Sequence, residues 1–329
     1  MKIAVVILNW NGKELLKQFL PSVIEYSENA KIYVADNASS DDSISFIKTN
    51  YPQVTIIQNT TNGGYAKGYN EALKHVDEEI YCLLNSDVEV TKNWLLPILE
   101  GFKRESRTAI IQPKILDYNN KKFFEYAGAT GGFIDKYGYP FCRGRIFNTI
   151  EKDNNQYNDS TKIFWASGAC FFIRKSVFDS LNGFDETFFA HIEEIDLCWR
   201  AFNLGFETKY IGESKVFHVG GATLKNTNPK KTYLNFRNSL FAITKNANGS
   251  VFFLILTRLI LDGIAGVKFL FEGKLFHVIA IIKSHFSFYR NLLRLLKQRK
   301  TLTQKKKYYY TTSIVWSYFI NKKRVFKSL

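Results

Sequence analysis

The 329-residue sequence contains few cysteines, prolines and methionines: four Cys, six Pro and one Met. The cysteines stand far apart and form no C-x-x-C pair, so neither a zinc ribbon nor a dithiol motif is indicated. We expect free, mostly buried thiols in a reducing cytosol. The sequence also lacks G-x-G-x-x-G and G-x-x-x-x-G-K-[ST]. These absences disfavour a Rossmann dinucleotide site and exclude an ATP-type P-loop.

Acidic residues are nearly absent from the C-terminal quarter. Residues 250–329 contain 16 Lys and Arg against 2 Asp and Glu, whereas residues 1–249 contain 29 against 28. A nearly neutral body therefore carries a strongly basic tail. Such an asymmetry indicates a polyanionic surface as the partner of the tail, either acidic phospholipid or nucleic acid.

Short apolar runs alternate with helical patterns over the first 115 residues. The expected strands are residues 3–8, 31–35, 54–58, 80–84 and 109–115, and the expected helices are residues 13–27, 40–48, 63–74 and 91–104. This order predicts a doubly wound α/β domain, in which ligands bind beyond the carboxyl ends of the strands.

Polar clusters follow three of these strands, at residues 9–12, 36–39 and 85–87. Asp87, at the carboxyl end of a buried strand, is well placed to hold a divalent metal against a diphosphate. The Gly63-Gly64 loop opens a helix whose N-terminal amides suit a phosphate. Turn formation alone would also favour Asn, Ser and Asp at strand ends, so each cluster taken singly has a structural explanation.

The second half contains a crowded acidic group. Glu193, Glu194 and Asp196 place three carboxylates within four residues. Crowding of this kind can raise one pKa and make a general base useful near neutral pH. The alternative is the ordinary preference of acidic residues for a first helical turn. Residues 117–160 are loop-rich, and we interpret part of them as a flap over the crevice or as a plain insertion.

Eight motifs occur in a fixed order. They are V-V-I-L-N-W-N-G at 5–12, V-A-D-N-A-S-S-D at 34–41, N-G-G-Y-A-K-G-Y-N at 62–70, L-L-N-S-D at 83–87, S-G-A-C-F-F-I-R at 167–174, G-F-D-E-T-F-F at 183–189, E-E-I-D-L-C-W-R at 193–200 and Y-L-N-F-R-N at 233–238. In this combination the chain resembles the family 2 glycosyltransferases of the GT-A fold, especially bacterial rhamnosyltransferase-like members. The resemblance covers about residues 1–245.

The resemblance implies an α/β nucleotide-diphospho-sugar transferase fold, a doubly wound mixed sheet, to which the pattern of the tail adds a helical, basic, membrane-associating C-terminal extension. It implies a catalytic domain over 1–245, divided into a nucleotide-sugar-binding half (1–115) and an acceptor half (116–245). Residues 246–329 would form the tail.

The resemblance also implies roles for individual residues. The nucleotide sugar would be contacted by Asn9, Asn11 and Asp36 and by the loop that carries Asn62, Gly64, Lys67 and Asn70. Asn85 and Asp87 stand where the family has its D-x-D motif, with Asp87 and His218 as ligands of Mg²⁺ or Mn²⁺. Glu194 stands at the position of the catalytic base, and either it or Glu193 would take the proton. Asp196 and Arg237 would lie near the substrate, Arg237 at the diphosphate, while Trp165 and Gly168 would shape the acceptor side; a core role for Trp165 is an equal alternative.

The implied function is an inverting, metal-dependent glycosyltransferase of bacterial cell-surface polysaccharide synthesis. The donor would be a dTDP- or UDP-linked sugar and the acceptor a glycan, lipid-linked in our interpretation. Two alternatives are a nucleotidyltransferase of similar fold and a polyanion binder that uses the basic tail. We expect no nucleic acid partner.

The tail predicts attachment to a membrane surface. Residues 251–271 are long enough to span a bilayer, but Arg258, Asp262 and Lys268 make that costly. Residues 275–297 place four basic side chains on one helical face, a pattern typical of a helix lying in a membrane interface. We therefore expect a cytoplasmic protein, peripheral on the inner face of the plasma membrane through residues 250–329. Packing of these helices on the catalytic domain, or into a dimer, is the alternative.

Overall fold

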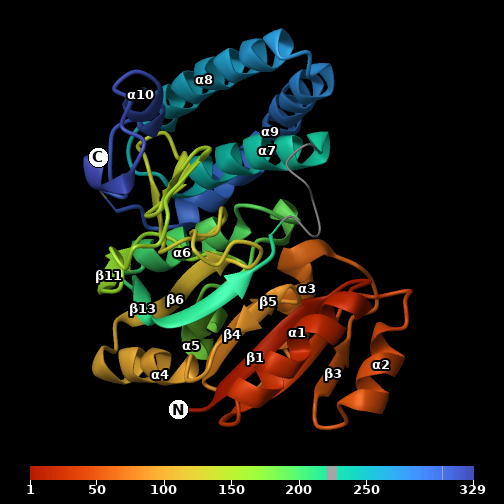
Figure 1. Cartoon of the computed structure of the whole chain (residues 1–329). Coiled ribbons are helices and arrows are strands. Elements are labelled where there is room, and N and C mark those ends of the chain that lie inside the picture. The colour runs from red at the N-terminus through yellow and green to blue at the C-terminus, as the bar shows by residue number, and fades with distance from the viewer. Residues whose placement is uncertain (221–227, 306) are drawn as a thin grey trace.

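Alternating strands and helices build the N-terminal half, as the apolar periodicity predicts (Figure 1). The computed structural model describes residues 1–220, 228–305 and 307–329, so Lys306 of the basic tail lies outside the described residues. The strands of the main sheet are β1 (Ile3–Asn9), β2 (Ala30–Asp36), β3 (Thr55–Gln58), β4 (Ile80–Asn85), β5 (Val88–Val90), β6 (Thr108–Asp117), β11 (Ser160–Ile163), β12 (Cys170–Arg174) and β13 (Glu207–His218).

Helices cover both faces of this sheet and close two apolar cores. They are α1 (Lys13–Tyr26), α2 (Ser43–Asn50), α3 (Gly64–Leu73), α4 (Leu95–Arg104), α5 (Lys175–Ser180) and α6 (Glu193–Asn203), with a short 3-10 helix η1 (Glu186–Phe188) before α6. The helix expected from residue 91 starts later, because residues 88–90 form β5 and pair with the end of β13.

The sheet is mixed, and its topology sets the position of the polar strand ends. The strand order is β11-β13-β6-β12-β4-β1-β2-β3, with β5 paired to β13. β1 runs parallel to β2 and β4, whereas β12 is antiparallel to β4 and β6. In this register Asn9 lies opposite Asp36, and Leu8 lies opposite Asn85. The predicted convergence of the polar clusters on one edge of the sheet is therefore confirmed.

Part of the region expected to be loops forms a second, four-stranded sheet, in the order β10-β9-β8-β7. Its strands are β7 (Gly132–Ile134), β8 (Pro140–Cys142), β9 (Arg145–Ile146) and β10 (Thr149–Ile150). Strands of two or three residues are too short to produce a recognisable alternation of apolar and polar residues. The prediction of a loop-rich insertion was therefore incomplete.

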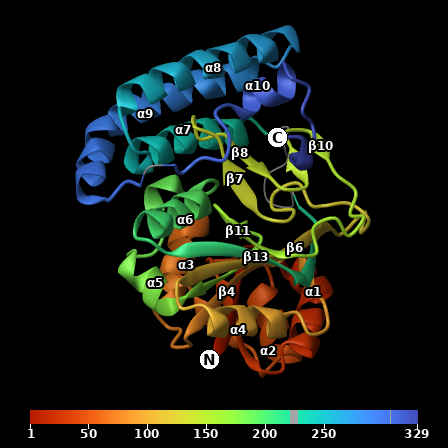
Figure 2. The same ribbon diagram turned by 90° about the vertical axis from the view of Figure 1, so that its left-hand side faces the viewer.

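The C-terminal region is a stack of helices that lies on the rest of the molecule (Figure 2). It contains α7 (Pro229–Asn246), α8 (Val251–Phe271), α9 (Leu275–Thr301), α10 (Ile314–Phe319) and the 3-10 helix η2 (Phe326–Ser328). Its last part returns to the small sheet: the amide of Tyr310 donates to the carbonyl of Ile134, and that of Ile314 to the carboxylate of Asp135. The tail is thus packed onto the body, as the packing alternative predicts.

None of the helices in the described residues is both long enough and apolar enough to cross a bilayer.

Candidate active site

The ends of β1 and β2 are joined by a buried polar network. The amide nitrogen of Asn9 donates to the carboxylate of Asp36 at 3.1 Å and to the hydroxyl of Ser39 at 3.2 Å. The side chain of Asn11 accepts from the amide of Ser40 and so fixes the loop after β2. The buried Oδ1 of Asn9 has no hydrogen-bond partner among the described residues. The sequence-predicted residues Asn9, Asn11 and Asp36 therefore lie together, and one buried acceptor among them is left for a ligand.

The N-terminus of α3 does not have the free amides that the Gly63-Gly64 loop led us to expect. The amide of Gly64 donates to the side chain of Asn62, and the amide of Tyr65 donates to the carbonyl of Phe189 at 2.8 Å. A Cβ at Gly64 would stand 2.5 Å from that carbonyl, and φ at Gly64 is +77°. The phosphate role predicted for these amides is thus not supported, because a loop from the second half already occupies them.

The other two residues predicted in this loop differ in exposure. Lys67 is exposed, whereas Asn70 is partly buried. The side-chain amide of Asn70 donates to the carbonyl of Phe184, and its oxygen accepts from the amide of the same residue. Asn70 therefore fastens the segment before η1 to α3, a structural role in place of the predicted contact with substrate.

Asp87 and His218, predicted as metal ligands from positions far apart in the sequence, face each other. β5 pairs with the end of β13, and this pairing brings the Asp87 carboxylate to 3.1 Å from Nε2 of His218. On the other side of the ring, the Glu125 carboxylate lies 3.4 Å from Nδ1. All three side chains are at most 7% exposed. Glu125 was not foreseen, because it lies in the region interpreted as loops and belongs to no motif.

The carboxylates of Glu125 and Asp87 affect the protonation of the His218 ring. Burial acts to lower the pKa of His218, but the charges of Glu125 and Asp87 outweigh it and raise the pKa to about 10. Burial likewise acts to raise the pKa of Asp87, and the charge of His218 brings it below its ordinary value. Glu125 and Asp87 thus favour a cation at this position.

The residues present fit a divalent metal as a partial ligand set. Carboxylate oxygen and imidazole nitrogen are both ordinary ligands of Mn²⁺, and Mg²⁺ is commonly bound through one or two carboxylates plus substrate phosphates. Among the described residues no cluster of three or more His, Cys, Asp or Glu side chains is arranged around a metal position. Asp87 and His218 would therefore hold an ion whose remaining ligands come from substrate and water.

Glu193 and Glu194 begin α6; Glu193 is buried and Glu194 is partly buried. Burial raises the pKa of Glu194 to about 7. Burial and the neighbouring charge of Glu194 raise the pKa of Glu193 well above its usual range. One oxygen of each carboxylate, Oε2, has no hydrogen-bond partner among the described residues. Both carboxyl groups therefore hold a proton more readily than a free glutamate does, and the pKa of Glu194 lies near neutral pH.

The backbone that leads into these glutamates is strained. Phe189, His191 and Ile192 have φ values of 65°, 68° and 72°, in the left-handed region that few side chains adopt without cost. The side-chain amide of Asn238 holds this loop by donating to the carbonyls of Phe188, Ala190 and His191.

Arg237 contributes to the same support. Its guanidinium donates to the carbonyls of Thr187 and Phe188 and to the side chain of Asn238. The predicted contact of Arg237 with the diphosphate is therefore replaced by a role in fixing the loop before α6.

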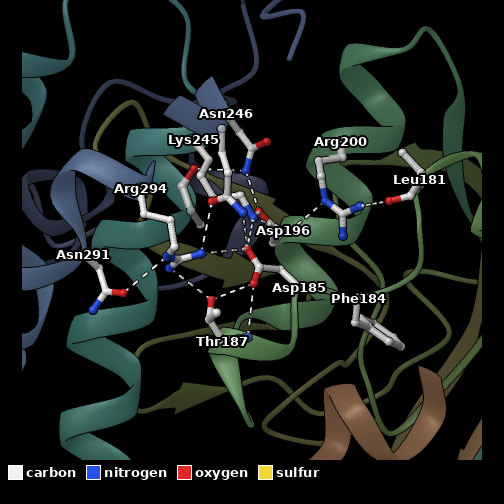
Figure 3. A network of polar contacts seen from close by, with 12 residues as sticks. Leu181, Phe184, Asp185, Thr187, Asp196, Arg200, Lys245, Asn246, Asn291 and Arg294 are labelled. Atoms are coloured by element: carbon white, nitrogen blue, oxygen red, sulfur yellow. Dashed lines mark hydrogen bonds and ion pairs between the residues drawn. The ribbon is translucent and has the colours of Figure 1, made fainter. Parts of the chain in front are cut away.

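Asp196 also has a role other than the predicted one. It is fully buried, and its carboxylate is 2.8 Å from Nε of Arg200 and 3.0 Å from Nζ of Lys245. Figure 3 shows Asp196 beside Asp185, with Lys245 between them and Arg294 approaching from α9. Asp196 thus anchors α6 to α7 and does not reach a substrate.

On the acceptor side, Trp165 takes the core position that was the alternative. Its indole is 2% exposed, lies against Gly132, and donates to the carbonyl of Phe133. Gly168 remains near the glutamates: its carbonyl accepts from the hydroxyl of Tyr65, whose pKa is raised by burial and by the charges of Tyr69, Glu193 and Glu194.

Cys142 and Arg145 of the small sheet lie side by side, near the carboxylates described above. Burial raises the pKa of Cys142, and the charges of Glu125 and Glu194 act in the same direction. Arg145 donates to the sulfur of Cys142. The charge of Glu125 helps to raise the pKa of Arg145. Glu125, the neighbour of His218, and the candidate base Glu194 therefore both lie within electrostatic range of one thiol.

Comparison with known proteins identifies the type of site. The family model described as glycosyl transferase family 2 matches residues 4–181. The chain is 23% identical over 231 residues to the N-acetylglucosaminyl-diphospho-decaprenol L-rhamnosyltransferase of Mycobacterium tuberculosis, covering 66% of this chain and 75% of that protein. It is 25% identical over 287 residues to the low-salt glycan biosynthesis hexosyltransferase Agl10 of Haloferax volcanii, covering 84% and 87%.

A solved structure has the same fold. The mannosyltransferase PcManGT from Pyrobaculum calidifontis, in complex with GDP-Man and Mn²⁺, superposes with a TM-score of 0.55 at 13% identity, over 91% of this chain and 84% of that one.

Proposed function

Since the chain belongs to glycosyl transferase family 2 and is a glycosyltransferase, we propose that it transfers a sugar from a nucleoside-diphosphate donor with inversion of the anomeric carbon. Two observations support this proposal: Asp87 and His218 face each other at the strand ends, and burial raises the pKa of Glu194 to about 7. The resemblance to rhamnosyl- and hexosyltransferases favours glycosyl transfer over the nucleotidyltransferase alternative.

Glu194 acts as the general base in this proposal. It takes the proton of the acceptor hydroxyl as that oxygen forms its bond to the anomeric carbon. The bond from this carbon to the diphosphate breaks at the same time, and the diphosphate leaves with the electron pair. A base with a pKa near the working pH is the most effective one for such a transfer. Attack from the face opposite the leaving group needs no covalent intermediate on the protein.

Asp87 and His218 hold the leaving-group side. A divalent metal bound there, Mg²⁺ or Mn²⁺, would offset the negative charge that develops on the departing diphosphate. Glu125 fixes the ring of His218 from the opposite nitrogen, so that Nε2 points toward Asp87. Ring orientation by a second carboxylate is common among metal-bound histidines.

The donor and acceptor follow from the same reasoning. The strand-end network of Asn9, Asn11 and Asp36 is suited to the base and ribose of a dTDP- or UDP-linked sugar. We further propose a lipid-linked glycan acceptor in cell-surface polysaccharide synthesis, since a relative acts on a diphospho-decaprenol substrate according to its name. The enzyme would then work at the inner face of the plasma membrane.

A donor screen tests the proposed function. Nucleoside diphosphate release is measured for a panel of nucleotide sugars with and without Mn²⁺, using the wild-type protein, Asp87→Asn and the exposed control Asp42→Asn. We expect metal-dependent release by wild type and control, a loss of at least about 100-fold for Asp87→Asn, and weaker Mn²⁺ binding by this variant in calorimetry. Full activity and unchanged Mn²⁺ affinity of Asp87→Asn would show that the metal site is assigned wrongly.

A further inference from the structure

The outward side of α8 is apolar along its whole length. Its exposed apolar residues are Phe252, Phe253, Leu256, Ile260, Ile264, Val267, Leu270 and Phe271. They recur every three or four residues, so they form one stripe along the helix. Ile264 is 60% exposed and Phe271 is 87% exposed. A stripe of this size on a surface marks an interaction site more often than chance exposure.

Of the three charges that make α8 costly as a membrane span, Arg258 and Asp262 are turned inward, whereas Lys268 is exposed near the end of the helix. Nε of Arg258 lies 2.9 Å from Oδ1 of Asp262, and both side chains are at most 4% exposed. The guanidinium lies 3.7 Å from the ring centre of Tyr139, whose hydroxyl donates to Asp262. The ring of His285 on α9 reaches the other oxygen of Asp262 at 3.3 Å. One side of α8 is therefore bound to the protein through polar contacts, while the opposite side presents only apolar groups over its central turns.

The next helix continues the pattern and adds positive charge. The exposed apolar residues of α9 are Leu275, Phe276, Ile279, Ile282, Phe286, Tyr289 and Leu293. Exposed cations lie among them at Lys283, Arg290 and Lys297. Glu272, in the turn between the helices, is already paired with Lys274 and Lys268. The exposed apolar residues of α8 and α9 together are called the hairpin face below.

We propose that the hairpin face docks in the plane of an anionic phospholipid bilayer, with its apolar side chains among the acyl chains and its cations at the phosphates. Charge complementarity favours this occupant over a second copy of the chain: α8 to α10 carry many more cations than carboxylates, and two such faces would repel each other. An amphipathic helix with basic flanks is the usual element for this purpose. The inference deepens the proposed function, because it gives a lipid-linked acceptor a surface from which to reach the site.

Docking would also orient the catalytic centre. Arg294 of α9 donates to the hydroxyl of Thr187 at 3.2 Å, in the segment that leads into α6. Asn238 of α7 holds the following loop. The hairpin and the catalytic helix are thus parts of one rigid arrangement, so a docked hairpin sets the height of Glu194 above the lipid.

Site-specific labelling tests the docking. All four native cysteines are buried, so a cysteine introduced at an exposed position can be labelled selectively with an environment-sensitive fluorophore. We would label Ile264→Cys on α8 and Leu96→Cys on α4, which are similarly exposed at 60% and 58% and lie at opposite ends of the molecule (Figure 1). With vesicles of phosphatidylcholine and phosphatidylglycerol, we expect a blue shift at position 264 and none at position 96. Equal responses, or no response at 264, would overturn the proposal.

Substitutions supply the second measurement. In vesicle co-sedimentation, Ile260→Gln/Ile264→Gln should lower partitioning on the order of tenfold or more, because two buried side chains are lost. The control Leu96→Gln should not change it, and added salt or vesicles of phosphatidylcholine alone should weaken binding of the wild type. A wild type that ignores vesicles and sediments as a dimer, with the double variant monomeric, would make a second copy the occupant. Vesicle binding requires no donor or acceptor, so this result stands apart from the enzyme assay.

Discussion

Two pairs of carboxylates near the start of α6 have pKa values that are shifted in opposite directions. Among the described residues no cation pairs with Glu193 or Glu194, and burial raises the pKa of both. Asp185 and Asp196 lie beside Lys245, and although burial acts to raise their pKa values, the charge of this lysine helps to hold them below their ordinary range. The two aspartates, whose network is drawn in Figure 3, therefore stay ionised, whereas the two glutamates take up a proton more readily.

The difference comes from residues remote in sequence. Lys245 reaches the aspartates from the end of α7, and Arg200 reaches Asp196 from the next turn of α6. In the part of the chain that the structure describes, no ion pair reaches the glutamates, and their surroundings are largely aromatic and apolar. Crowded carboxylates therefore do not indicate a base by themselves; what decides is which of them the fold supplies with a counterion.

The largest effect is expected from removing the proton acceptor. Glu194→Gln keeps the size of the side chain and should lower turnover about 100-fold to 10,000-fold, the usual contribution of a general base. The measurement is the rate of nucleoside diphosphate release in the presence of acceptor, with unchanged circular dichroism as the control. Wild-type turnover in this variant would remove Glu194 from the mechanism.

The next effect is on stability. Lys245→Met leaves Asp185 and Asp196 buried without their shared cation and should cost about 3–5 kcal/mol in the free energy of unfolding. Urea denaturation measures it. The loss should be full near neutral pH and should shrink in acid, because protonation of the aspartates removes the unpaired charge. Adding Asp196→Asn to this variant should restore part of the stability, whereas Lys92→Met on the surface should change little.

A smaller effect separates the two glutamates. Burial and the charge of Glu194 raise the pKa of Glu193 well above its usual range, so we expect the neutral Glu193→Gln to change turnover only a few-fold, on the order of a lost hydrogen bond. Activity should rise through pH of about 7 in both the wild type and this variant, since Glu194 must lose its proton. A shift of the midpoint or complete loss of activity in Glu193→Gln would exchange the two roles.

The same titration has a consequence for stability. The folded pKa of Glu194 is raised above its unfolded value, so its contribution to stability is present in acid and is lost as pH rises through about 7. Glu194→Gln should therefore melt above the wild type at alkaline pH and close to it in acid.

The smallest effect belongs to the most exposed member of the aspartate group. Arg294, with its side chain 34% exposed, lies 3.8 Å from Asp185. Arg294→Gln should cost about 0–1 kcal/mol, as partly exposed ion pairs do. A cost near that of Lys245→Met would show that the two cations act as one unit.

Much of the fold could be predicted from local patterns, because buried strands and amphipathic helices leave periodic traces. The position of Asp87 after β4 and its approach to His218 followed from strand order and motif. Glu125 could not be foreseen, since it reaches His218 from a segment of very short strands. Arg237 was misjudged because a guanidinium binds backbone carbonyls as readily as phosphate, and only the fold shows which lies nearby.

The tail illustrates the same limit. Its basic composition and the helix over residues 275–297 were evident in the sequence. The orientation of α8 was not, because Arg258 and Asp262 interrupt its apolar character unless one knows that they pair beneath Tyr139.

The three left-handed residues before α6 have a consequence for synthesis of the chain. Asn238, which holds their carbonyls in place, is translated well after the two glutamates it serves. A nascent polypeptide that has only reached α6 therefore carries both glutamates on a loop without its support.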